Sequence, residues 1–328
     1  MKINIYISII LLSVIFLNKY SIAQQLPINT NYVLNNYAYN PAVAGSKPHA
    51  VANFNYRNQW VGFQDAPKTF MLSLYSTVGK QKKVAIGTLI NSDNTGLLSR
   101  TSGYLTFGYH VKLNKTYKLG LAASIGMVQY RVKLYDAKVA DTGDNLLTGN
   151  ILSNNVFDSN GGLYLYSDNL FFGLSTYQYL GNKLTFKDSQ SKLSQHIYAT
   201  VGYTFKLSKI ISVQPTALIK FNKPSPIQPE FSMRVIYKNI FWVGSSYRLN
   251  ESVSALFGVT IKDKLTIAYS YDIITSKIRT YTSGSHEIML TYQFIKPKKK
   301  LDSDEEELND IDNSIKSKFK KQNEESSK

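Results

Sequence analysis

The sequence of 328 residues contains no cysteine. Disulfide bonds, thiolate metal sites and cysteine-based catalysis are therefore excluded, as is a lipid anchor on an N-terminal cysteine. Charged residues are scarce as well, at 18%, against roughly 25% in soluble domains. Beyond residue 23 no apolar run approaches the roughly 18 residues of a membrane-spanning helix. The sequence thus predicts no transmembrane helix in the mature chain.

Motifs that carry catalytic or metal chemistry are also missing. The histidines, His49, His110, His196 and His286, are scattered without metal-ligand spacing. There is no Gly-x-Ser-x-Gly turn and no phosphate-binding glycine loop. The loop Asp141–Asn145 has some carboxylates of a calcium site but lacks the full ligand series. The sequence therefore predicts a protein that is not an enzyme and carries no cofactor or metal.

Tyrosine and positive charge are abundant. The chain has 24 tyrosines and a formal net charge of +16. Tyrosine suits surfaces that are half wet and half apolar, such as membrane interfaces. Excess positive charge favours acidic partners, which include acidic proteins, anionic lipids and nucleic acids.

Residues 1–23 are typical of a secretory signal peptide. Lys2 supplies the basic start, Ile5–Leu17 is apolar, and Ser21-x-Ala23 is a cleavage site that would leave Gln24 first. The alternative is an uncleaved anchor helix, for which the apolar run is short. Export makes nucleic acid an unexpected partner.

The mature chain reads as a series of short strands. In 265–271 apolar or aromatic residues occupy the odd positions, and in 288–294 the even ones. This period of two is typical of a sheet wetted on one face. We expect about fourteen strands, at 51–58, 68–77, 84–91, 103–113, 117–130, 159–167, 169–178, 196–206, 210–220, 230–238, 240–248, 253–262, 264–273 and 285–294. A secreted β-sandwich or solenoid is the alternative fold.

The expected connections alternate between short and long. The short ones lie near residues 78–83, 114–116, 168, 207–209, 239 and 263. The longer ones span 59–67, 92–102, 131–158, 179–195, 222–229 and 274–284. Outer-membrane barrels have short periplasmic turns and longer extracellular loops. The sequence therefore predicts an all-β transmembrane antiparallel barrel in the cell outer membrane, with both termini on the periplasmic side.

Three blocks near the N-terminus carry a family resemblance. They read Asn40-Pro41-Ala42-x-Ala-Gly45, Tyr56-Arg57-x-Gln59-Trp60-x-Gly62 and Ala66-Pro67-x-Thr. Together they resemble the N-terminal signature of the PorP/SprF family of outer-membrane proteins, which serve type IX secretion and gliding in Bacteroidetes. Asp65 stands where that family more often has a small residue.

The resemblance implies a non-enzymatic accessory component of the type IX secretion system. Such a barrel helps to secrete or anchor surface proteins such as adhesins. It couples to periplasmic ring proteins or to peptidoglycan-linked proteins. A passive porin or hydrophobic-solute transporter is the alternative function, and a purely structural surface barrel is a third. Arg57, Gln59 and Trp60 are expected to form a structural clamp with the Trp60 ring buried.

Lysines dominate the expected periplasmic turns and nearby strand ends, where only Asp168 and Asp263 oppose them. These lysines are Lys80, Lys82, Lys83, Lys112, Lys115, Lys118, Lys206, Lys209, Lys238, Lys262 and Lys264. They are either a solvated rim facing lipid headgroups or a docking face for an acidic partner. If the lysines form a docking face, we expect Lys80, Lys82, Lys83, Lys262 and Lys264 to contact the partner.

The expected organisation has four parts. A signal peptide covers 1–23, and a polar segment covers 24–48. The barrel covers 49–295, and a charged disordered tail covers 296–328. This segment is too polar to face lipid, so it either plugs the lumen or lies beneath it on the periplasmic side.

Overall fold

The computed structural model describes residues 26–27, 29–133, 151–186, 189–223 and 225–295. The chain divides into two compact units, Met1–Phe294 and Ile295–Lys328. The first unit carries the fold below, and only Ile295 is described in the second. The predicted signal peptide, the Asp141–Asn145 loop and the predicted tail at 296–328 lie outside the described residues.

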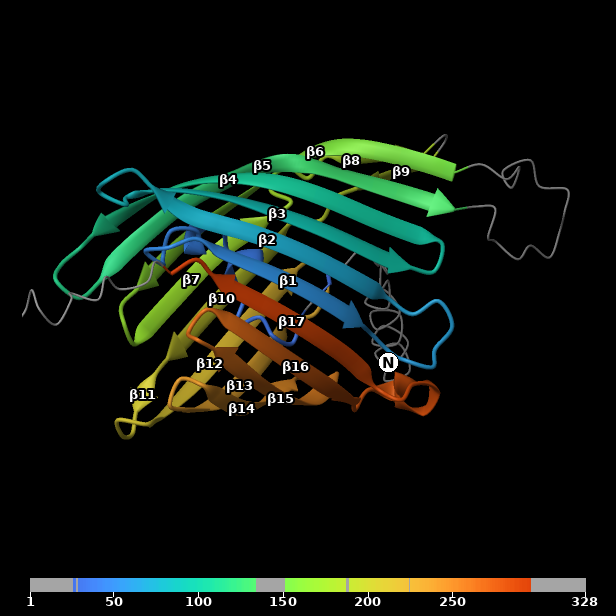
Figure 1. Cartoon of the computed structure of the whole chain (residues 1–328). Coiled ribbons are helices and arrows are strands. Elements are labelled where there is room, and N and C mark those ends of the chain that lie inside the picture. The colour runs from blue at the N-terminus through green and yellow to red at the C-terminus, as the bar shows by residue number, and fades with distance from the viewer. Residues whose placement is uncertain (1–25, 28, 134–150, 187–188, 224, 296–328) are drawn as a thin grey trace, which may run out of the picture. The chain divides into compact units, whose positions relative to one another are not determined.

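The first unit consists of strands and three short 3-10 helices in its described part (Figure 1). The strands are β1 (Val51–Asn58), β2 (Lys68–Val78), β3 (Val84–Thr95), β4 (Leu98–Lys112), β5 (Lys118–Lys133), β6 (Ile151–Tyr166), β7 (Leu170–Tyr177), β8 (Lys183–Phe186), β9 (Ser189–Lys192), β10 (His196–Tyr203), β11 (Phe205–Lys206), β12 (Ile211–Asn222), β13 (Gln228–Tyr237), β14 (Phe241–Arg248), β15 (Ser252–Ile261), β16 (Leu265–Ile274) and β17 (Ser285–Gln293). The 3-10 helices are η1 (Asn36–Ala38), η2 (Pro41–Val43) and η5 (Lys277–Tyr281).

The described strands close into an antiparallel barrel of fourteen strands. Most barrel strands pair with their neighbours in sequence, whereas β7 pairs with β10, β10 pairs with β12, and β1 pairs with β17. The two-residue β11 pairs with β12 beyond the end of β10, and β8 and β9 form a separate hairpin between β7 and β10. Closure leaves no sheet edge, so the strands satisfy their backbone groups among themselves, as a bilayer requires.

Side chains alternate between the lumen and the lipid. Along β2, Met71, Ser73 and Tyr75 are buried in the lumen, whereas Leu72 and Leu74 point outward. The same alternation runs along the other strands and gives an apolar outer surface. Aromatic residues mark the turn end of this surface, as membrane-interface girdles do: they are Tyr109, Tyr203, Phe205, Tyr237, Phe241, Tyr292 and Phe294.

The short turns lie at one end of the barrel, which is the periplasmic end. β1 begins and β17 ends here, and Phe294 N donates to Ala50 O at 2.9 Å. Two of these turns have positive φ at both central residues, Lys238–Asn239 and Lys262–Asp263. This is the type I′ geometry that matches the twist of a two-strand hairpin.

One predicted extracellular loop is in fact strand. Residues 92–102 were expected as a long loop, but β3 runs to Thr95 and β4 begins at Leu98. Gly96, at φ +55°, makes the tight turn between them. Polar residues at the ends of β3 and β4 obscured their alternation, because the pair projects past the apolar belt. A second predicted loop, 179–195, contains the β8–β9 hairpin. A third, 131–158, is shorter than predicted, because β6 begins at Ile151.

The N-terminal segment fills the lumen. We call residues 26–27 and 29–50 the plug segment. Its tyrosines Tyr32, Tyr37 and Tyr39 are almost wholly buried among side chains of the barrel wall. Figure 1 shows this blue segment inside the ring of strands. Of the two placements left open by the sequence, the luminal one is observed.

Candidate functional site: the plugged lumen and its two ends

The plug segment runs from the extracellular end of the barrel to the periplasmic end. Leu26 N donates to His196 Nε2, and Leu26 O accepts from Lys220 Nζ. His196 and Lys220 lie at the loop ends of β10 and β12. From there the segment descends to Ala50 beside β17. The chain thus passes through the lumen before β1 begins.

The Asn-Pro-Ala block builds the 3-10 turn that docks on the wall. Asn40 caps η2, since its Oδ1 accepts from Ala42 N at 2.9 Å. Its Nδ2 donates to Leu163 O of β6 at 2.8 Å. Pro41 is the first residue of η2, where its fixed φ suits the turn and no amide donor is lost. Ala42 is fully buried.

Glycines in the wall make room for this turn. A Cβ on Gly162 of β6 or on Gly173 of β7 would overlap the Asn40 side chain. A Cβ on Gly120 of β5 would lie 2.7 Å from Ala42 O. On the plug side, Gly45 has φ +88°, and a Cβ there would lie 2.6 Å from the Cβ of Ala85. The fit between η2 and the wall therefore depends on residues without side chains.

Wall side chains hold the plug on either side of η2. His110 of β4 bonds Ala44 O through Nε2 at 2.5 Å and Tyr166 Oη through Nδ1 at 3.0 Å. Tyr37 Oη lies 2.7 Å from Thr106 Oγ1.

A buried ionic network fixes the plug nearer the extracellular end. Arg57 of β1 contacts Asp272 of β16 at 2.5 Å and Glu287 of β17 at 3.1 Å. Glu287 also accepts from the backbone N–H groups of Thr30 and Asn31, at 2.7 and 3.0 Å. Side chains of three adjacent strands thus converge on two plug residues.

A second arginine joins the network from the other side. Arg248 of β14 contacts Glu230 of β13 and Glu251, each at 2.8 Å. Its Nη2 reaches Thr30 Oγ1 at 3.3 Å, and the same hydroxyl contacts Asp272 at 2.9 Å. Thr30 is therefore the residue at which both arginines meet the plug.

This network specifies position more than it adds stability. Removing charges from water costs several kcal/mol per ion, and the pairing only offsets that cost. A displaced plug would leave Asp272 and Glu287 without the Thr30 donors in a buried site. The arrangement therefore favours one register of the plug in the lumen.

Within the second signature block, only Arg57 joins this network. Tyr56 points outward to lipid and is 39% exposed. Trp60 and Gly62 lie in the β1–β2 loop with positive φ, and Gln59 N donates to Pro67 O. That loop also bonds the β16–β17 loop, because Val61 N donates to Gly284 O at 2.8 Å.

The expected three-residue clamp is thus not what the described residues show. Trp60 is only partly buried, because β1 ends at Asn58 and Trp60 lies in the loop that follows, at positive φ. Gln59 and Trp60 instead line a cavity at the extracellular end, together with Pro67. Ala66 precedes Pro67 in the same loop.

The five lysines that were expected to contact a periplasmic partner lie in two separate groups. Lys80, Lys82 and Lys83 lie on the β2–β3 turn, and Lys82 Nζ donates to Pro48 O of the plug at 3.0 Å. Lys262 and Lys264 lie on the β15–β16 turn, separated from the first group by β1 and β17.

A cavity of about 1020 Å³ opens at the periplasmic end, and we call it the vestibule. Lys82 and Lys83 line it, whereas Lys80, Lys262 and Lys264 do not. Its other lysines are Lys47, Lys112 and Lys118, and Asp168 is the single acidic residue of its lining. Among the described residues, the ion pairs are those of Arg57 and Arg248, so these lysines have no carboxylate partner within 4 Å.

Sequence reasoning missed most of the luminal network. Glu230, Arg248, Asp272 and Glu287 were not singled out, and neither was Thr30. One sequence signal could have revealed them: these charged residues occupy strand positions that the alternation of side chains assigns to the lumen. Which of these charges pair depends on strand order around the barrel, and which reach Thr30 depends on the path of the plug.

The three signature blocks thus have distinct places, in the plug turn, the luminal network and an extracellular loop. The family model for the type IX secretion system membrane protein PorP/SprF matches residues 21–292. The chain belongs to the PorP/SprF family. It is a type IX secretion membrane protein of the outer membrane, crossed by many strands. No curated protein sequence matches it.

Solved structures share the barrel. The CymD monoaromatic hydrocarbon channel is similar with a TM-score of 0.50 at 10% identity, over 80% of this chain and 93% of CymD. The toluene transporter TbuX of Ralstonia pickettii is similar with a TM-score of 0.48 at 11% identity, over 79% of this chain and 93% of TbuX. A FadL homologue of Pseudomonas aeruginosa is similar with a TM-score of 0.44 at 12% identity, over 83% of this chain and 96% of the homologue. At such identities the likeness concerns the fold alone.

Two further features are absent from the described residues. None of the described helices is long and apolar enough to cross a membrane. No group of three or more His, Asp or Glu residues within the described ranges is placed to hold a metal ion.

Proposed function

We propose that this PorP/SprF protein is a non-enzymatic accessory of the type IX secretion system that serves as a docking platform. It helps to secrete or anchor surface proteins such as adhesins at its extracellular end. At its periplasmic end it couples to ring proteins or to peptidoglycan-linked proteins of the machinery. The observation that carries this proposal is the luminal plug, held by neutral and ionic contacts along its length.

The alternative is transport of a solute. The printed names of the similar barrels, a monoaromatic hydrocarbon channel and a toluene transporter, favour a hydrophobic solute. A passive porin is the simpler version. Against both stands the plug segment, whose backbone and side chains occupy the lumen from Leu26 to Ala50. A platform requires no open path, whereas a transporter would have to displace these contacts.

The vestibule is the proposed contact with the periplasmic machinery. Its lysines form no ion pair within 4 Å among the described residues, and complementary charge speeds and orients association. The proposed partner surface is acidic. Because each exposed pair contributes only about 0–1 kcal/mol, several lysines must act together.

Two charge-reversal variants of equal size test this contact. The first changes Lys82, Lys83, Lys112 and Lys118 to Glu. The matched control changes Lys206, Lys209, Lys262 and Lys264 to Glu, at turns outside the vestibule. Both change the net charge equally, and heat-modifiable gel migration checks that each barrel assembles. Periplasmic type IX proteins are then recovered with the barrel from native membranes and identified.

The vestibule variant should lose these partners while the control retains them. Recovery with the wild type should fall as salt rises, because the screening length is about 10 Å at 0.1 M. Equal recovery with both variants at low salt would overturn the docking assignment. No type IX protein recovered with the wild type would overturn the platform itself.

A further inference from the structure

A second cavity opens at the extracellular end of the barrel, and we call it the outer pocket. It has a volume of about 320 Å³. Its walls are largely apolar and aromatic, from Leu26, Pro27, Trp60, Leu98 and Tyr130. Such a size and lining are typical of sites for small molecules or short peptide ends.

Arg100 is the unusual group in this lining. It lies on β4 and is 6% exposed. Neither its Nε nor its Nη1 has a hydrogen-bond partner among the described residues. Its guanidinium lies 5.9 Å from the Tyr130 ring centroid, and no described carboxylate lies within 4 Å. Tyr130 hydrogen-bonds the guanidinium, and Asp93 and Asp158 act on it electrostatically without forming an ion pair. A buried cation without a direct ion pair is costly, so an added anion would be favourable there.

Asp93, the cross-strand partner of Arg100 on β3, is already engaged by other groups. Asp93 accepts from Thr69 Oγ1 at 2.6 Å and from Thr95 Oγ1 at 3.3 Å. The other acid of the pocket, Glu251, accepts from Arg248 and from Gln228. Neither forms an ion pair with Arg100.

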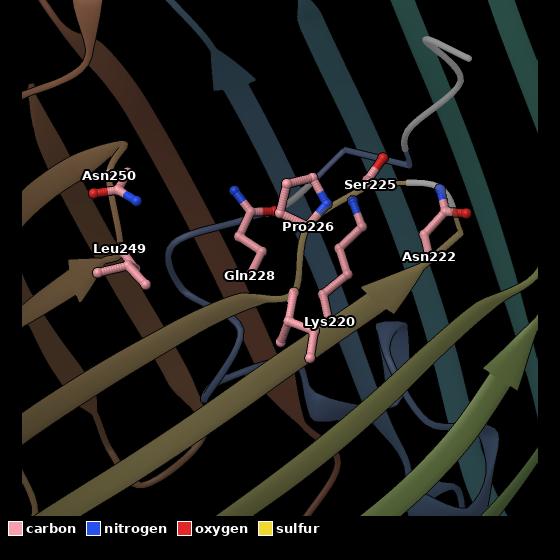
Figure 2. A pocket seen from close by; sticks show the side chains of 8 residues that line it. Lys220, Asn222, Ser225, Pro226, Gln228, Leu249 and Asn250 are labelled. Carbon is pink, nitrogen blue, oxygen red and sulfur yellow. The ribbon is translucent and has the colours of Figure 1, made fainter. Parts of the chain in front are cut away.

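Lys220 adds a second buried basic group to the outer pocket. Burial lowers the pKa of Lys220 to about 7, and an anion bound beside it would favour its charged form. Lys220 is 3% exposed, and its Nζ donates to Leu26 O at 2.7 Å, which is a neutral acceptor. It also lines an adjoining cavity of about 210 Å³. Figure 2 shows its side chain extending from the strand toward Pro226 and Ser225. The two cavities share Lys220 and Gln228, so together they form one region that contains the two buried basic side chains of Arg100 and Lys220.

We propose that the outer pocket binds an organic carboxylate with an apolar body. The carboxylate meets Arg100 and Lys220, and the apolar body packs against Trp60, Tyr130 and Leu98. An ionised carboxylate only accepts hydrogen bonds, and it suits the planar donors of a guanidinium. The ligand is either a free carboxylic acid or the carboxyl end of a peptide. This site is independent of the vestibule and of the platform proposal.

The experiment uses the purified full-length barrel in detergent and three probes of similar body. N-acetylphenylalanine represents a peptide carboxyl end, 4-phenylbutyrate represents a free acid, and N-acetylphenylalanine amide lacks the carboxylate. Binding is measured by calorimetry and by quenching of Trp60 fluorescence. The chain has two tryptophans, so the signal is read against a Trp242→Phe background.

At least one acid should bind saturably, and the amide should not. Arg100→Gln and Lys220→Met should each weaken binding by about tenfold or more, as loss of a charge-assisted hydrogen bond predicts. Lys262→Gln, on a distant turn, should bind as the wild type does. The acid that binds identifies the source: N-acetylphenylalanine alone indicates a peptide end, 4-phenylbutyrate alone a free acid, and both a pocket that accepts either.

Failure of both acids to bind, or equal binding of acid and amide, would overturn the proposal. The comparison of acid with amide needs only the wild type, so it holds even if Arg100→Gln fails to assemble. Arg100→Lys keeps the charge but loses the planar donors, and it should bind more weakly than the wild type and more tightly than Arg100→Gln.

Discussion

At the scale of single residues, the plug depends on Thr30 and the charges around it. Thr30 is fully buried, and its hydroxyl contacts Asp272, Arg57 and Arg248. Its backbone N–H donates to Glu287. The strands supply the charges, and the plug supplies the neutral donors that complete them. Thr30 thus links the sequence of the N-terminal segment to the chemistry of the wall.

Removal of Arg57 should destabilise the whole barrel. Arg57→Ala leaves Asp272 and Glu287 unpaired in a buried site, at a cost of roughly 3–5 kcal/mol. We expect a lower temperature for loss of the folded band in heat-modifiable gel migration. Tyr56→Ala, one position away but facing lipid, is the matched control and should change that temperature far less. An unchanged temperature for Arg57→Ala would show that the network is not a structural element.

At the scale of elements, η2 and the wall of β5, β6 and β7 fit because glycines remove the side chains between them. Gly162 is the test position, since any Cβ there overlaps Asn40. Gly161, its neighbour, is the control, because its Cβ would meet nothing closer than 3.9 Å. Both lie on β6, so the effect on strand propensity is similar.

Gly162→Val should displace the plug without preventing barrel closure, because all strand pairings can still form. Limited proteolysis of the assembled barrel, with cleavage sites mapped, should then show cuts between residues 29 and 50 that the wild type resists. The Gly161→Val variant should resist cleavage in this segment as the wild type does. If Gly162→Val remains as resistant as Gly161→Val, the close docking of η2 is wrong.

The sequence predicts the strands far better than the interior. Alternation placed β1 at its observed bounds and most other strands within a few residues, since lipid on one side and the lumen on the other impose a period of two. It failed at residues 92–102, where both faces of the extended β3–β4 pair are polar. Arg57 contacts carboxylates as predicted, but the Trp60 ring is only partly buried, because a signature block does not reveal where a strand ends. The pairing of Arg57 with Asp272 needs the closure of β1 onto β17, which no local pattern encodes.

At the scale of the whole molecule, the barrel is a closed wall around its own N-terminal segment. Lysines that form no ion pair among the described residues line one end, and the buried side chains of Arg100 and Lys220 line a pocket at the other. The apolar belt between them places both ends outside the bilayer core. Such a molecule presents two separate surfaces, one to the periplasm and one to the exterior, with the lumen occupied between them.

The central claim is that the plug closes the lumen, and conductance across a planar bilayer tests it most directly. The wild-type barrel should insert without steady ionic current. Gly162→Val, in which η2 is displaced, should show current, and Gly161→Val should not. A steady, ohmic current through the wild type, at the level of an open barrel of this size, would contradict the account and favour a transport function.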